Sequence, residues 1–139
     1  MIMFKRLFEP GQIGRISIRN RLIMAPMATN LASVTGEVTP EVIEHYAARA
    51  RGGVGMVIVE ATCIDAPIGK GFMHEMRLDH DKFIAGHFQL TEVIHNYGAK
   101  AAVQLHHAGR HASLEITEGH QPVAPSPIKE LSQVISPHV

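Results

Sequence analysis

The chain has 139 residues, of which 45% are hydrophobic and 19% charged, and its 13 basic residues balance its 13 acidic residues. This length predicts a single domain, and the zero net charge means that no overall field steers the chain toward nucleic acid or an anionic membrane. Cys63 is the single cysteine, which excludes an internal disulfide and predicts a reducing compartment. Nothing in the sequence indicates a lowered thiol pKa, so we interpret Cys63 as structural.

The first residues do not resemble a targeting segment. Lys5 and Arg6 precede only two apolar residues before Glu9 and Pro10 interrupt them, so no signal-peptide core follows. Nowhere does the sequence approach the ~18 consecutive apolar residues that a membrane span requires. We therefore expect a cytoplasmic protein that contacts neither a membrane nor nucleic acid.

Residues 11–27 predict two short extended segments. Ile16, Ser17 and Ile18 alternate between apolar and polar, which is typical of a half-buried hairpin strand. Residues 22–25 form a continuous apolar run, which is typical of a strand covered on both faces, and Pro26 ends it.

A helix and a buried strand are expected next. Thr39 can cap a helix, Pro40 fits its first position, and Gly52 with Gly53 ends it. Residues 54–61 then form a short apolar strand bounded by glycines. The apolar face of the helix comprises Ile43, Tyr46, Ala47 and Ala50.

The helix and strand pattern then repeats. Asp79 or Asp81 is expected to cap a second helix, which Gly98 closes. Residues 101–105 predict another buried strand, and the glycine- and proline-rich sequence beyond residue 109 predicts a long loop. The apolar positions of the second helix are Phe83, Leu90, Ile94 and Tyr97, with Ile84 and Phe88 widening the face.

The order of strand, helix, strand, helix and strand predicts an α/β protein with adjacent parallel strands. Both an open doubly wound sheet and a closed barrel fit this order. The first strand-to-helix turn reads Pro-Met-Ala-Thr-Asn at residues 26–30 and lacks the glycine fingerprint of dinucleotide-binding folds. This difference disfavours the open sheet.

Two polar residues stand at the carboxyl ends of the predicted strands, where parallel α/β proteins place their sites. Glu60 closes an otherwise apolar run, and Gln104 sits within one. Burying Gln costs about 1–3 kcal/mol unless its amide finds partners, which could be neighbouring backbone or the amide edge of a ligand. Met27, which follows Pro26, could offer a flat ligand soft apolar surface or could fill the core.

Histidine is abundant, with ten copies, but indicates no metal site. His107 and His111 are four residues apart, which on a helix could bind zinc. Gly109 lies between them at a strand end, and no third ligand is near in the sequence, so we expect no metal. The histidines in predicted helices, which we assign to packing or surface positions, are His45, His87 and His95.

Short motifs run in order along nearly the whole chain. They are LFEP at 7–10, RNR at 19–21, APM at 25–27, YAARA at 46–50, GGVG at 52–55, VEA at 59–61, GAK at 98–100, QLHHAGR at 104–110 and APS at 124–126. Together, in this order and spacing, they resemble the Old Yellow Enzyme family, in its NADH:flavin oxidoreductase and 2,4-dienoyl-CoA reductase branch.

The resemblance implies that residues 1–139 are the N-terminal segment of a single FMN-binding TIM (β/α)8 barrel, with about three βα strands preceded by a β-hairpin. Such a barrel needs ~250 residues or more, so the remainder would be absent. The family's catalytic residues and phosphate loops lie on later strands, and we expect them beyond Val139. A 4Fe-4S cluster could be held only by an absent C-terminal part.

The resemblance also implies the positions that bind FMN. The backbone of Pro26, Met27 and Ala28 would lie against the reactive edge of the flavin. Ala61 would contact the ring through its backbone, and Gln104 would bind the pyrimidine end. In this family NAD(P)H reduces FMN, and the reduced flavin passes hydride to the β-carbon of an activated alkene, a small-molecule substrate.

Two positions depart from part of the family. Some relatives carry Cys directly after Pro-Met and Tyr two positions later, where this chain has Ala28 and Asn30. The roles of that Cys and that Tyr therefore cannot be assigned here.

Three hypotheses follow. The first is an N-terminal portion of a flavin-dependent ene or dienoyl reductase. The second is a truncated or split chain, inactive alone, which acts only as a complement to the rest of the barrel; a partial barrel exposes a strand edge, so the rest of the barrel or a homo-oligomer is its expected partner. The third is a free-standing α/β binding module without flavin.

Overall fold

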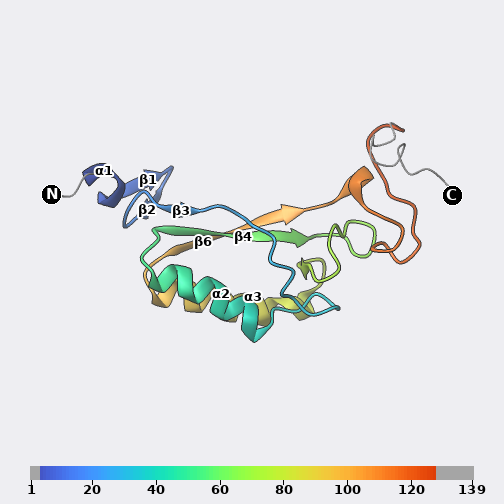
Figure 1. Cartoon of the computed structure of the whole chain (residues 1–139), viewed down its shortest axis with the longest axis horizontal. Helices are drawn as coiled ribbons and strands as arrows, with labels where there is room; N and C mark the ends of the chain where they lie inside the picture. Colours follow the sequence, from blue (N-terminus) through green and yellow to red (C-terminus); the bar gives the residue numbers. More distant parts are fainter. Residues whose placement is uncertain (1–3, 128–139) are drawn as a thin grey trace.

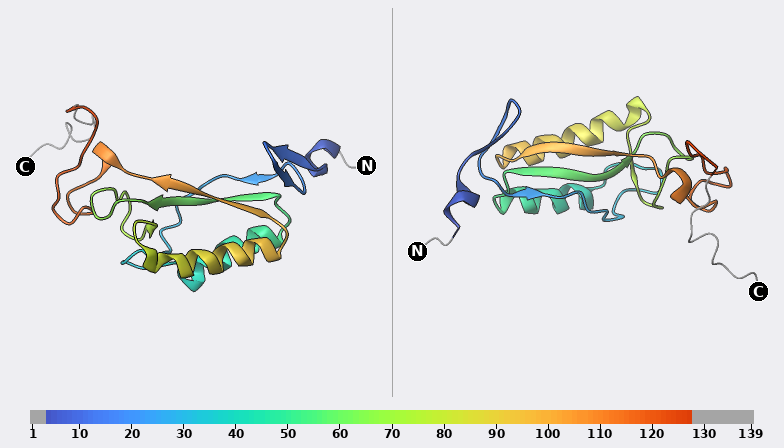
Figure 2. Two further views of the ribbon diagram at one scale, coloured as in Figure 1. Left: turned by 180° about the vertical axis from the view of Figure 1, so that it is seen from behind. Right: turned by 90° about the horizontal axis from the view of Figure 1, so that it is seen from above.

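A computed structural model describes residues 4–127 of the chain. Its centre is a parallel sheet (Figure 1) in which β4 (Met56–Cys63) lies between β3 (Ile23–Met24) and β6 (Lys100–His106), as the view from above in Figure 2 shows. A fourth short strand, β5 (Met76–Arg77), pairs with the carboxyl end of β4. The predicted order of adjacent parallel strands is therefore confirmed, whereas β5 was not predicted.

Two helices cover one face of this sheet. Helices α2 (Pro40–Arg51) and α3 (Ile84–Asn96) lie beneath the strands in Figure 1, and the view from above in Figure 2 shows them side by side behind the sheet. Their apolar faces pack against the residues of β4 that point toward them. The largest buried side chains of this core are Val42, Tyr46, Val57, Met76, Leu90 and Ile94.

A small N-terminal unit lies at the amino ends of the strands (Figure 2). It consists of the short helix α1 (Lys5–Phe8) and the antiparallel hairpin of β1 (Gly11–Ile13) and β2 (Ile16–Ile18). The hairpin was predicted and α1 was not. The Arg19 guanidinium ties this unit to the helix layer by donating to the carbonyls of Ala50, Val54 and Tyr97 at 2.6–3.2 Å.

The first helix begins and ends where its sequence predicts. The Thr39 hydroxyl accepts a hydrogen bond from the Val42 amide at 3.2 Å, and Gly52 forms the carboxyl cap. The second helix begins differently. The His80 side chain accepts from the Lys82 amide and starts a 3-10 turn, η1 (Asp81–Phe83), which leads into α3.

Neither aspartate predicted as a cap serves as one. Asp79 instead binds the Arg77 guanidinium in a two-point contact at 2.6 and 2.9 Å, and Asp81 lies inside η1. The prediction that Ile84 and Phe88 widen the apolar face of α3 is also wrong, because these side chains are 59% and 62% exposed. They lie on the side of α3 that no described element covers.

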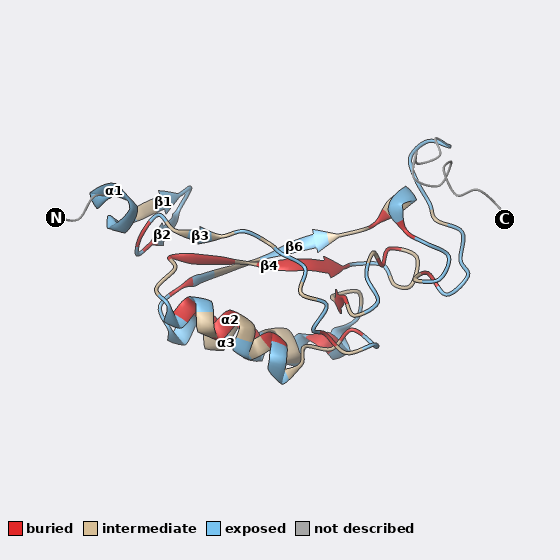
Figure 3. Cartoon of the chain, viewed as in Figure 1, coloured by how far each residue is buried: buried red, intermediate tan, exposed pale blue. Residues whose placement is uncertain are grey.

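The strands β3, β4 and β6 differ in how deeply they are buried (Figure 3). β4 is buried along nearly its whole length, as predicted. β3 and β6 are not, because Ile23 is 43% exposed and Leu105 is 62% exposed. Both strands lie at edges of the described sheet, and within residues 4–127 no α-helix follows β6, only the short 3-10 turn η2 (Gly109–His111). The prediction of fully buried outer strands is therefore wrong for this part of the chain.

No helix among the described residues is both long and apolar enough to cross a membrane.

Candidate functional site

The residues singled out from the sequence gather at one edge of the sheet, where the strands end. Residues 26–28 follow β3, whereas Ala61 lies in β4 and Gln104 in β6. Ala61 and Gln104 are direct partners in the β4–β6 register. The segment after β3 is bound to β4 one residue before Ala61, through Thr29 and Glu60. All five predicted positions therefore belong to one region.

Gln104 is exposed in the structure, and its amide makes no hydrogen bond with any described residue. Within the described residues, the neighbouring backbone therefore does not satisfy the hydrogen-bonding groups of this amide, contrary to the first of the two alternatives. A free amide offers one acceptor and two donors side by side. It can bind a ligand group that presents a donor next to an acceptor, as the pyrimidine end of a flavin does.

Met27 and Ala28 present free backbone as well as side chains. Met27 is 65% exposed, so it does not fill the core. Neither of their two amides donates a hydrogen bond within residues 4–127. Together with the Gln104 amide, they form a set of unused donors beside soft apolar surface, which fits the polar edge and flat faces of FMN.

Glu60 is the principal residue whose contacts the sequence did not predict. Glu60 is 4% exposed, and its carboxylate accepts hydrogen bonds from the Thr29 amide at 2.5 Å and the Thr29 hydroxyl at 2.6 Å. The Tyr46 hydroxyl accepts from the Glu60 amide at 2.8 Å and donates to the carboxylate at 3.2 Å. Burial raises the pKa of the Tyr46 hydroxyl, which keeps it a hydrogen-bond donor.

Asn30 has taken a structural role at the position where some relatives carry Tyr. Its φ of 59° lies in the left-handed region, which Asn tolerates better than most residues. Its side-chain oxygen accepts a hydrogen bond from the His74 amide at 2.8 Å. The loop after β3 is thus bound to the loop before β5.

A second polar cluster lies at the end of β6. The His106 Nδ1 lies 2.6 Å from a carboxylate oxygen of Glu75, which is almost fully buried. The other oxygen accepts from the amides of Gly71 and Phe72 at 2.7 and 3.3 Å, and the Phe72 ring stacks on His106 with centroids 6.0 Å apart. A side chain at residue 71 would place its Cβ 2.8 Å from the imidazole. Glu75 and His106 are 31 residues apart, so no local pattern could predict the pair.

His107 points to a different partner from His106. Its Nε2 lies 3.6 Å from an Asp65 carboxylate oxygen, and its Nδ1 accepts from the Gly109 amide at 3.0 Å. Among residues 4–127 no group of three or more His, Cys, Asp or Glu side chains could hold a metal ion. Cys63 is fully buried, and burial raises the pKa of its thiol to about 11, which favours the predicted structural role.

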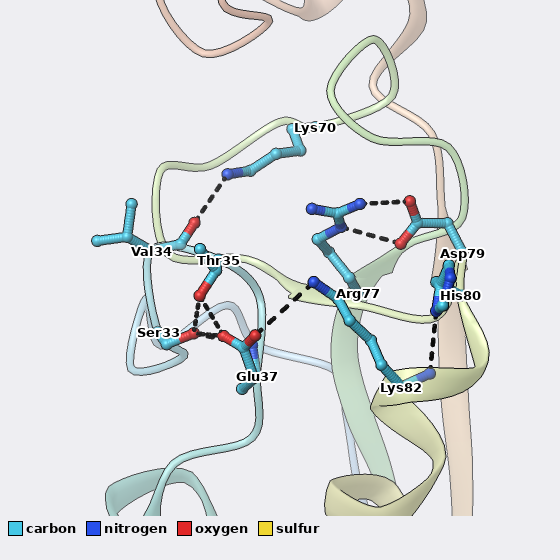
Figure 4. Close-up of polar contacts among 9 residues, drawn as sticks. All are labelled: Ser33, Val34, Thr35, Glu37, Lys70, Arg77, Asp79, His80 and Lys82. Atoms are coloured by element: carbon cyan, nitrogen blue, oxygen red, sulfur yellow. Dashed lines mark hydrogen bonds and ion pairs between the residues drawn. The ribbon is translucent and has the colours of Figure 1, made fainter.

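Polar contacts brace the loops around the site (Figure 4). The Glu37 carboxylate accepts hydrogen bonds from the Ser33 and Thr35 hydroxyls, which lower its pKa, and lies 4.0 Å from the Lys82 ammonium. The buried Lys70 ammonium donates to the carbonyls of Val34 at 3.4 Å and Met73 at 3.1 Å. The Lys70 contact with Val34 joins the loop after β3 to the loop between β4 and β5, and the Glu37 contact with Lys82 joins the loop after β3 to η1.

The sequence matches a family of known proteins. The sequence model of the NADH:flavin oxidoreductase / NADH oxidase family matches residues 6–137. The chain is 54% identical over 128 residues to an NADH oxidase of Thermoanaerobacter brockii, which covers 92% of this chain and 20% of that protein. It is 41% identical over 125 residues to an NADH:acrylate oxidoreductase of Vibrio harveyi, which covers 90% of this chain and 12% of that protein.

A solved structure of the Old Yellow Enzyme homologue from Zymomonas mobilis superposes with a TM-score of 0.78 at 32% identity, over 86% of this chain and 33% of that chain. The chain thus spans a fifth or less of these curated relatives and about a third of this structure. The described fold is the N-terminal portion of a TIM (β/α)8 barrel, with its parallel strands preceded by a β-hairpin, as predicted. The chain belongs to the NADH:flavin oxidoreductase / NADH oxidase family.

Proposed function

We propose that this chain forms one wall of the FMN site of an NAD(P)H-dependent oxidoreductase of the Old Yellow Enzyme type. In this proposal residues 1–139 belong to a single FMN-binding barrel domain. Pro26, Met27 and Ala28 line the reactive edge of the flavin, Ala61 contacts the ring through its backbone, and Gln104 binds the pyrimidine end. The observation that carries the proposal is the register of Ala61 with the unpartnered Gln104 amide.

The chain's own contribution is to bind and orient. The free amides of Met27 and Ala28 are donors for flavin acceptors, and the Gln104 amide adds a donor and an acceptor on the neighbouring strand. A donor on a strand loses little backbone freedom when the cofactor binds, and β6 already holds the backbone of Gln104. When bound, FMN would accept hydride from NAD(P)H and deliver it to the acceptor substrate.

We further propose that the acceptor is an activated alkene. Support comes from the relative that acts on acrylate, an alkene activated by its carboxyl group. The described residues include no assigned proton donor, so we expect the groups that polarise and protonate the substrate to lie on other strands of the barrel.

A chimera tests the proposed cofactor. Residues 6–137 would replace the matching segment of the Thermoanaerobacter brockii NADH oxidase, with which the chain shares 54% identity. We expect a yellow protein that retains FMN and oxidises NADH. A folded chimera that purifies without flavin would contradict the proposal.

A second candidate function is that of a structural complement, inactive alone. The observation that favours it is the exposed outer strand β6, where Val103 and Leu105 are 38% and 62% exposed, beside an unpaired sheet edge. Such an edge is a template for pairing with further strands of the same barrel. Co-expression of this chain with the NADH oxidase lacking its matching segment would test it. We expect the two polypeptides to purify together with flavin, and separate purification would refute this role.

A further inference from the structure

The flavin-facing loop of this chain is held from behind by a buried carboxylate. Residues 26–28 have no hydrogen bonds of their own to fix them among the described residues, whereas the next residue, Thr29, is bound at both its amide and its hydroxyl. Both bonds go to Glu60. The conformation of the free segment therefore depends on the contact that follows it directly.

The carboxylate reaches Thr29 because of an irregularity in β4. The β4–β6 register shifts between Val59 and Ala61, so Glu60 is an extra residue with no partner on β6. A bulge of this kind redirects side chains. In an unbroken ladder Glu60 would oppose Gln104, whereas here it turns toward Tyr46 of α2, and Ala61 takes the place opposite Gln104.

The carboxylate is fixed on its other side as well. Tyr46 is fully buried, and its hydroxyl contacts both the backbone amide and the carboxylate of Glu60. The Thr29 hydroxyl in turn accepts a hydrogen bond from the Leu31 amide at 3.3 Å. A continuous set of hydrogen bonds thus runs from the core of α2 through Glu60 to the loop.

We infer that Glu60 is a positioning residue for the cofactor: it acts through Thr29 to hold the amides of Met27 and Ala28 in place for FMN. The part of this inference that concerns FMN rests on the proposed function. The hydrogen bonds by which Glu60 fixes the loop do not depend on it. Glu60 makes no contact with the cofactor itself in this role. Its carboxylate lies on the helix side of the sheet, where Tyr46 contacts it.

Hydrogen exchange of the 139-residue chain tests the hold on the loop. In Glu60→Ala the Thr29 amide loses its acceptor, and we expect its exchange to accelerate at least tenfold while the amides of the β4–β6 ladder stay protected. Glu60→Gln can keep one oxygen on the Thr29 amide and turn its NH2 group toward the Thr29 hydroxyl. We expect this variant to restore most of the protection.

Glu37→Ala is the matched control, because it removes a carboxylate that binds two hydroxyls in the same loop. It should leave the exchange of Thr29 unchanged. If Glu60→Ala fails to fold, Thr29→Val removes only the hydroxyl contact and should accelerate exchange at Leu31, whose amide loses its acceptor. Wild-type exchange at Thr29 in a folded Glu60→Ala variant, or at Leu31 in Thr29→Val, would overturn the inference.

Titration with FMN, followed by amide chemical shifts, tests the link to the cofactor. We expect FMN to shift the amides of Met27 and Ala28 in the wild type and in Glu37→Ala, and to shift them at least threefold less in Glu60→Ala. If FMN shifts no amide in the wild type, the proposed function fails, whereas the exchange data still decide whether Glu60 holds the loop. Equal FMN shifts in Glu60→Ala and wild type would refute the positioning role alone.

Discussion

Ala61 of β4 and Gln104 of β6 are partners in the β4–β6 register, and the pair before them is Val59 with Val103. Between these two pairs β4 contains one extra residue, whereas β6 contains none. Because side chains alternate between the faces of a strand, a shift of one residue exchanges the faces. The extra residue, Glu60, therefore leaves the face that carries Gln104, and Ala61 joins it. This replacement of a carboxylate by a methyl group leaves the Gln104 amide without a protein partner.

Replacing Gln104 should weaken FMN binding without weakening the fold. In the chimera, Gln104→Ala removes two neutral hydrogen bonds worth about 0.5–1.5 kcal/mol each, so we expect the FMN dissociation constant to rise about tenfold. The side chain is exposed and unpartnered, so the Tm should not change. Quenching of flavin fluorescence measures the affinity. Gln89→Ala, at an exposed position of α3, is the control, and an equal loss of affinity in both variants would disprove the role of Gln104.

Arg19 should matter for stability although it is exposed, because its guanidinium binds the carbonyls of Ala50, Val54 and Tyr97. We expect Arg19→Met to lower the free energy of unfolding in urea by about 1–2 kcal/mol. Arg19→Lys should recover only part of this loss, because one ammonium cannot reach all the carbonyls that the guanidinium fork reaches. Arg15→Met, which alters an exposed arginine of the hairpin turn, should change stability by less than about 0.5 kcal/mol. Equal effects of Arg15→Met and Arg19→Met on the free energy of unfolding would show that the hydrogen bonds of the Arg19 guanidinium do not stabilise the fold.

Much of the fold is predictable from the sequence because its determinants are local. Thr39, Pro40 and Gly52 delimit α2 through contacts within one turn, and the apolar run of β4 is buried wherever it packs. The predicted site positions also lie together, because parallel strands end at one edge. The start of α3 was mispredicted because Asp79 and Asp81 are both cap formers by type, whereas Asp79 binds Arg77 and His80 caps the 3-10 turn before α3.

The remaining features depend on contacts that distant residues make. Glu60 stands out in the sequence as a polar residue ending an apolar strand, but its partner Thr29 is 31 residues away and its reorientation requires the bulge. The pairing of Glu75 with His106 is equally distant. The exposure of Ile84 and Leu105 follows from which neighbouring elements the described chain contains, which a hydrophobic pattern does not reveal.

The half-buried His87 should make the fold less stable as the pH falls. Burial lowers the pKa of this imidazole, whose Nε2 lies 3.0 Å from the Arg77 carbonyl. The unfolded chain then binds a proton more readily than the folded chain, so this contribution is complete above the unfolded value of about 6.5 and is lost as the pH falls through the lower folded value. We expect urea unfolding between pH 7.5 and 5 to show this slope.

The variant His87→Gln keeps a donor for the Arg77 carbonyl but does not titrate, so it should flatten the slope. His45 contributes in the same direction, because burial and then Arg49 lower its pKa, so some slope should persist. His95→Gln, at an exposed position of α3, should leave the slope unchanged. A slope identical in His87→Gln and wild type would contradict the assignment.

Cys63 should be nearly inert in the folded protein. Burial raises the pKa of its thiol to about 11 and removes it from solvent, so both the thiolate fraction and access are low at pH 8. We expect reaction with Ellman's reagent at pH 8 to be at least about a hundredfold slower in the folded chain than in urea. Equal rates in the two states would show that the thiol is accessible and would reopen a redox role.

The central claim is that residues 26–28, Ala61 and Gln104 form one wall of an FMN site. Two-dimensional 15N NMR of the purified chain, titrated with FMN, tests it most directly because it detects even weak binding residue by residue. The account predicts saturable shifts at the amides of Met27, Ala28 and Ala61 and at the side-chain NH2 of Gln104. Shifts confined to the helix layer, or no shifts at millimolar FMN, would contradict it.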